Sequence, residues 1–143
     1  MIRRFFVLSL IVFLFSGTCS VIAESPLIPD LKGNWTGPST GYDRVDGYDG
    51  PSRWQFSMSI TDQRDRVFNG TISYTNRLHP ENNGATGISG VIGPDMKSVY
   101  LVEYSDGIII GKIIDADMME FIYLESGKEA SAAIDTFTRV KET

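Results

Sequence analysis

The stretch Leu31-Lys32-Gly33-Asn34-Trp35-Thr36-Gly37 has a counterpart near the other end of the chain, Ile134-Asp135-Thr136-Phe137-Thr138-Arg139-Val140. In both stretches one face of an extended chain differs from the other, which is the period-two pattern of a β-strand. We predict that they are the first and last strands of a closed β-barrel and lie side by side. Trp35 would then plug the base of the barrel, with Arg139 over its ring in a cation–π contact.

Six further runs with period two lie between these segments, separated by Gly, Asp, Asn and Pro. Short connections make neighbouring strands antiparallel, and closure of the sheet removes its exposed edges. We therefore predict an all-β protein, an eight-stranded antiparallel up-and-down β-barrel, with a sandwich as the alternative. A short helical insertion within 125–133 is compatible with this class. The expected strands are 31–37, 53–61, 66–75, 85–92, 98–104, 108–114, 119–124 and 132–140.

The N-terminus has the pattern of a signal peptide: Arg3 and Arg4, an apolar run over 5–15, and small or apolar residues ending at Ala23. We predict that residues 1–23 are cleaved and that the protein is exported to the periplasm, the cell surface or the extracellular space. A retained anchor helix and lipid attachment at Cys19 are the alternatives. The remaining segment, 24–143, is predicted to be a single barrel domain.

The predicted mature chain is acidic, with 11 basic and 18 acidic residues and a net charge of −7. This balance argues against nucleic acid or anionic lipid as a partner. The one cysteine of the sequence, Cys19, lies in the signal segment. The mature domain is therefore expected to depend on packing and backbone hydrogen bonds instead of disulfides.

The run Leu31-x-Gly33-x-Trp35-Thr36, the run Phe68-Asn69-Gly70-Thr71 and the final segment resemble the corresponding strands of avidins and streptavidins. Gly-x-Trp near the start with an arginine near the end is also similar to lipocalins and fatty-acid-binding proteins, the wider calycin group. The resemblance implies a barrel with a cup-shaped lumen. It does not carry biotin binding, because Gly37 and Ile72 stand where avidins have polar contacts and no tryptophan follows Trp54.

A polar, glycine-containing segment, 38–52, is predicted to be a loop that repeats Gly-Tyr-Asp. Asp43, Asp46 and Asp49 are three residues apart and raise the question of calcium binding. Their spacing is not that of an EF-hand, so we predict a solvated loop with an aromatic tip and no metal site. Tyr42 in this loop offers a rigid amphipathic surface for contact with a ligand or partner.

No catalytic set is predicted. His79, the single histidine, lies in an expected loop over 76–84, and no nucleophile motif accompanies it. With no second histidine and no mature cysteine, a zinc site is not expected either. Glu103 and Glu120 lie within strands, where a carboxylate usually faces solvent.

These observations predict an exported, non-enzymatic barrel that binds a small, partly apolar ligand, with no cofactor. Trp54 and Tyr74 lie at strand ends beside long loops, so they and Tyr42 are the predicted ligand-binding residues. The first alternative is a cell-envelope module that binds a protein or glycan through 38–52 and 76–84, and the second is a barrel enzyme with a lumen carboxylate. The apolar runs 108–110 and 113–114 cannot all point inward, which favours a homo-oligomer.

Overall fold

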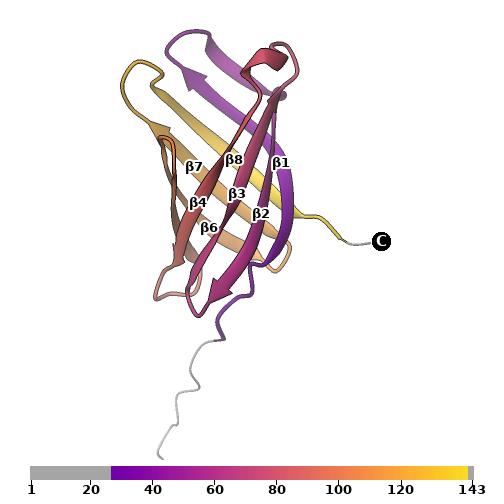
Figure 1. Ribbon diagram of the computed structural model, residues 1–143, viewed down its shortest axis with the longest axis vertical. Coiled ribbons are helices and arrows are strands. Elements are labelled where there is room, and N and C mark those ends of the chain that lie inside the picture. The colour runs from indigo at the N-terminus through magenta and orange to yellow at the C-terminus, as the bar shows by residue number, and fades with distance from the viewer. Residues whose placement is uncertain (1–26, 142–143) are drawn as a thin grey trace, which may run out of the picture.

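Every strand that the structure describes pairs with the strand before it and the strand after it, and the last pairs with the first (Figure 1). This computed structural model describes residues 27–141. The predicted all-β class and the closed, eight-stranded, antiparallel up-and-down barrel are both confirmed. The strands are β1 (Gly33–Asp43), β2 (Gly47–Arg64), β3 (Val67–Asn76), β4 (Gly84–Ile92), β5 (Ser98–Glu103), β6 (Ile108–Asp115), β7 (Met118–Glu125) and β8 (Ser131–Arg139).

The predicted signal peptide, 1–23, lies outside the described residues, so its cleavage and the alternatives at Cys19 stay predictions. Within 27–141, none of the helices has the length and apolar character needed to cross a bilayer.

The seam between β1 and β8 has the arrangement expected from the sequence. Trp35 lies opposite Arg139, whose guanidinium carbon is 4.1 Å from the centroid of the Trp35 ring. The guanidinium also donates to the carbonyls of Lys32 (2.6 Å) and Asp30 (2.9 Å), while Trp35 Nε1 donates to the Leu31 carbonyl at 2.9 Å. The predicted plug and cation–π contact are therefore confirmed. Arg139 additionally holds residues 30–32, which precede β1, against the base of the barrel.

The half of the lumen next to Trp35, called the closed end below, is filled by side chains. Gly37 shows how tight the seam is, because a Cβ atom there would lie 1.7 Å from the carbonyl oxygen of Thr136. No side chain fits at that position without movement of the backbone. The buried core residues are Leu31, Trp35, Met58, Ile60, Phe68, Ile72, Ile88, Ile92, Val99, Leu101, Ile109, Met119, Phe121 and Phe137.

The prediction of a loop over 38–52 was wrong. β1 continues to Asp43 and β2 begins at Gly47, whose positive φ of 82° closes a tight turn. Strand register passes from the pair Ser39–Trp54 to the pair Gly41–Asp49, so residues 50–53 bulge out of β2. Pro51 lies in this bulge, where no ladder hydrogen bond is required of it.

Two other connections were tested by the structure. Residues 126–130 form a turn instead of the short helix that was considered, and Gly127 adopts φ 98° within it. The expected loop over 76–84 is present between β3 and β4 and contains one short 3-10 helix, η1 (Pro80–Asn82).

Candidate functional site

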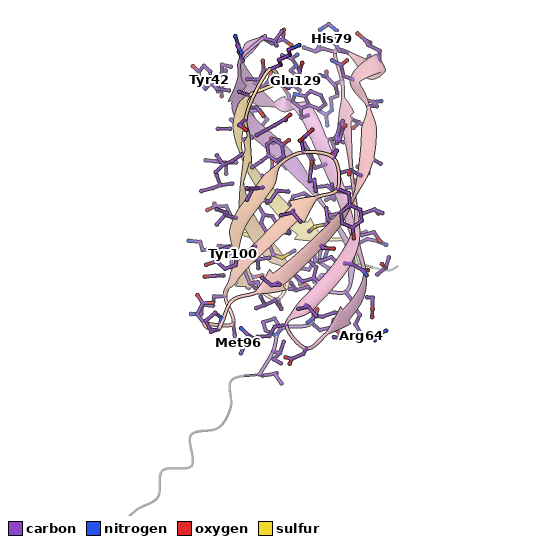
Figure 2. All side chains as sticks on the ribbon, turned by 60° about the vertical axis from the view of Figure 1, so that its left-hand side comes forward. Tyr42, Arg64, His79, Met96, Tyr100 and Glu129 are labelled. Carbon is purple, nitrogen blue, oxygen red and sulfur yellow. The ribbon has the colours of Figure 1, made fainter. Side chains whose placement is uncertain are left out.

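The end of the barrel opposite Trp35, called the open end below, contains a cavity of about 510 Å³. Figure 2 shows Tyr42, His79 and Glu129 at this end, with Arg64 and Met96 at the closed end. The volume lies within the range of ~300–1,000 Å³ that is usual for small-molecule sites. The residues that line it include Ser39, Tyr42, Asp43, Asp46, Asp49, Arg53, Trp54, Phe56, Tyr74, Glu103, Asp106, Tyr123, Glu125, Glu129, Ala133 and Asp135.

One wall of the cavity is aromatic. Phe56 of β2 and Tyr74 of β3 are paired in register, with ring centroids 5.9 Å apart, and Trp54 lies 6.4 Å from Phe56 and 6.0 Å from Tyr74. All three rings are only partly buried, so each presents surface to the cavity. Such a surface suits a flat or apolar molecule.

The structure brings the three predicted ligand-binding residues to the same cavity. Trp54 and Tyr74 lie in its aromatic wall, and Tyr42 lines its rim with its side chain largely exposed, next to Tyr48. Binding by these residues stays a prediction. Phe56 belongs to the same wall and was not among the predicted ligand-binding residues; its position two residues after Trp54, on the same strand face, was the available signal.

Carboxylates dominate the opposite wall. Glu103 ends β5, Glu125 ends β7, and Asp135 lies in β8 beside Ser39 of β1. The expectation that Glu103 faces solvent was wrong: Leu101 is buried in the lumen, and alternation along β5 turns Glu103 to the same side. For Glu120 the expectation is confirmed, since its side chain is exposed.

Burial changes the proton affinities of this wall. It raises the pKa of Glu103 to about 7, and the negative charges of Glu125 and Asp135 act in the same direction. It also raises the pKa of Asp135 to about 6, although a hydrogen bond with the Ser39 side chain acts in the opposite direction. Burial raises the pKa of Tyr123 as well, and its hydroxyl donates to Glu125 Oε2 at 2.7 Å. Two of the lumen carboxyls thus change charge near neutral pH.

Asp135 is the most deeply buried of these acids, with 2% of its surface exposed. Its Oδ1 atom has no hydrogen-bond partner. Leaving a buried carboxylate oxygen unpaired is costly, of the order of 1–3 kcal/mol. A ligand that donates a hydrogen bond to this atom would therefore gain more binding free energy than a ligand that does not.

The rim is organised around Arg53, which forms ion pairs with Asp46 and Asp49. Asp49 also accepts a hydrogen bond from Trp54 Nε1 at 3.0 Å, while Asp43 accepts from the backbone N–H groups of the turn. The three carboxylates considered for calcium are thus occupied by a cation and by the hairpin itself. Within 27–141, the structure contains no group of three or more side chains arranged to hold a metal.

His79 is exposed in the loop between β3 and β4, as predicted, with Nδ1 3.1 Å from Glu81 Oε1. It is not among the residues that line the cavity.

No protein-family description and no curated protein matches the sequence. Among solved structures, the chain is similar to a redesigned β-barrel, mFAP0, bound to DFHBI. They are 14% identical, with 76% of this chain and 98% of that one covered and a TM-score of 0.49. It is also similar to the S-type phycobiliprotein lyase CPES from Guillardia theta, at 11% identity, 79% and 90% coverage, and a TM-score of 0.47.

At these levels of identity and structural agreement, we infer neither a ligand nor an activity from the two structures. Membership of the avidin or lipocalin families stays a prediction. What is established is the closed eight-stranded barrel itself.

Proposed function

We propose that the protein is an exported, non-enzymatic barrel that binds a small, partly apolar molecule in the cavity at its open end. The observation that carries this proposal is the division of the lumen. Its closed end is packed with apolar side chains, whereas its open end leaves about 510 Å³ against three partly exposed aromatic rings. An aromatic wall beside converging polar groups is a common feature of small-ligand sites.

Native mass spectrometry of protein purified from its natural source tests the proposal, because it reads retained ligand and assembly mass together. We expect a bound small molecule on the natural chain. Trp54→Ala and Tyr74→Ala each remove one ring of the wall and are expected to lower occupancy about tenfold. Retention that is unchanged in both variants, with each variant folded, would contradict the assignment of the site.

Export is supported by the N-terminal sequence alone. If residues 1–23 are a cleaved signal peptide, the mature chain begins at Glu24. Mass measurement of the protein recovered from a cell-envelope or culture fraction distinguishes this form from a retained anchor and from a lipidated Cys19.

We also propose that the barrel forms a homo-oligomer through the outer surface of β3–β8. One row of directly opposed apolar side chains crosses these strands, and each member is 40–55% exposed: Val67, Val91, Tyr100, Ile110, Ile122 and Ile134. A second copy is the favoured occupant, because the part of this row on β5–β7 can serve both sides of a two-fold interface and the adjacent Lys112–Glu120 pair supplies both charges. Sedimentation of Ile110→Lys against the natural chain tests this, and a monomeric natural chain at high concentration contradicts it.

The alternative, recognition of a protein or glycan by the open-end turns, is favoured by one observation. Tyr42, Val45, Tyr48 and Leu78 expose 59–72% of their surface at the tips of these connections. Because 38–52 is mostly strand, deleting it would damage the barrel. Replacing Val45 and Leu78 with Ser is the appropriate test: loss of partner capture with ligand retention unchanged would support this function.

A further inference from the structure

The cavity is strongly acidic. Among the described residues that line it, eight are acidic and one is basic. The basic residue, Arg53, is already paired with Asp46 and Asp49 at the rim, so it does not neutralise the deeper carboxylates. An anionic ligand would meet repulsion throughout this space, and a cationic one would meet attraction.

The arrangement of the two walls narrows the kind of cation. The aromatic wall of Trp54, Phe56 and Tyr74 faces a lumen whose other side carries Glu103 and Asp135. A hydrated metal ion would make no use of the three rings. An organic cation uses both walls, because its charge is attracted to carboxylates and to aromatic faces alike.

Asp135 further restricts the class of organic cation that fits the cavity. Its buried Oδ1 lacks a hydrogen-bond donor, and Asp135 is one of the residues that line the cavity. A quaternary ammonium has no N–H to give, so it would leave this atom unpaired. A primary or secondary ammonium donates directly, in a charge-assisted hydrogen bond.

Resting on the function proposed above, we propose that the cavity selects a primary or secondary organic amine. Its ammonium donates to Asp135 and lies beside Glu103, while its flat apolar body packs on Trp54, Phe56 and Tyr74. Amine binding favours the ionised forms of these two carboxyls, so it releases protons and strengthens as the pH rises from 5 to 8. The charged and titratable groups that face this site are Tyr42, Asp43, Asp46, Asp49, Arg53, Tyr74, Glu103, Asp106, Tyr123, Glu125, Glu129 and Asp135.

Two fluorescent probes of nearly equal shape test the proposal: dansylcadaverine, which carries a primary ammonium, and its neutral N-acetyl derivative. We measure their dissociation constants by titration at pH 7.5 and expect the amine to bind at least tenfold more tightly. Asp135→Asn should remove most of that preference, weakening the amine about tenfold while changing the neutral probe less than threefold. Asp65→Asn, an exposed change in the turn between β2 and β3, is the matched control and should change neither constant.

The outcomes separate this inference from the function on which it rests. Equal binding of both probes, sensitive to Trp54→Ala, overturns the amine inference and leaves a ligand-binding barrel in place. Tighter binding of the neutral probe also overturns it. If neither probe binds and no ligand is retained by the natural protein, both the inference and the proposed function fail. Thermal unfolding of each variant confirms that it is folded before titration.

Discussion

The two tryptophans of the chain lie at opposite ends of one barrel, and their surroundings differ in kind. Trp35 is 1% exposed, and its indole N–H donates to a backbone carbonyl, that of Leu31. Trp54 is partly exposed, and its N–H donates to a carboxylate, that of Asp49, which an arginine also holds. At the closed end the indole N–H is paired with a backbone carbonyl, whereas at the open end it is paired with a charged side chain. We infer that stability resides in the first and binding in the second.

The largest expected effect comes from removing each ring in turn. Trp35→Ala should lower the free energy of unfolding by about 3–5 kcal/mol, because it leaves a cavity in packed core. Trp54→Ala should lower it by about 1 kcal/mol or less, since this ring already borders open space. Urea denaturation of both variants measures the difference. Equal losses would show that the two ends do not divide stability and binding between them.

A second prediction concerns the pH dependence that the open end imposes. Asp135 has a folded-state pKa of about 6, above its ordinary value of 3.8, so the folded state holds this proton more tightly. The contribution of Asp135 to stability should therefore fall as the pH rises from about 4 through 6 and level off above 7. Asp135→Asn removes the penalty and should raise the unfolding free energy at pH 8 by about 2–3 kcal/mol.

Denaturation curves of the Asp135→Asn variant and the natural chain at pH 4.5 and pH 8 provide the measurement. The increase in unfolding free energy caused by Asp135→Asn should be much smaller at pH 4.5 than at pH 8. A variant that is less stable at pH 8 would show that the ionised carboxylate is well accommodated even without a ligand.

The smallest expected effect on the free energy of unfolding comes from a substitution of Arg139 at the closed end. Arg139→Lys keeps the charge but loses the planar fork that donates to the carbonyls of Lys32 and Asp30 while covering Trp35. We expect a loss of about 1–2 kcal/mol in unfolding free energy. Lys141, an exposed cation that pairs with Asp117, is the matched control, and Lys141→Ala should cost less than about 0.5 kcal/mol.

The sequence predicted the closed end well, because that end follows period-two alternation. Trp35 and Arg139 met as expected, and six of the eight strands, β3–β8, agree with their predicted bounds to within one residue at each end. The exceptions were β1 and β2, which both extend into the predicted loop over 38–52. The glycines and Pro51 in this segment are typical of a loop. In the structure they lie at a bulge, which interrupts the period-two alternation of side chains without ending the strands.

The open end was harder to predict. Its polarity depends on which side chains at the ends of the strands point into the lumen and which point to solvent. Glu103 was assigned to solvent on a general tendency, although its alternation with Leu101 and Val99 predicts the inward face. The proton affinities of Glu103 and Asp135 depend on burial by other strands, which a single sequence does not state. Trp54, Tyr74 and Tyr42 line the same cavity, although Trp54 follows the bulge in β2 and does not lie beside the loop from which it was predicted.

The pairing of β1 with β8 also bears on how the chain acquires its structure. Thr36 and Thr138 are neighbours in the finished seam, so the barrel cannot close until β8 is available to pair with β1. Contacts between residues so distant in sequence make folding slow, because the intervening chain must first lose conformational freedom. Until then the edges of β1 and β7 are unpaired and open to other chains. The last strand of the barrel, β8, therefore decides when the whole domain becomes protected from aggregation.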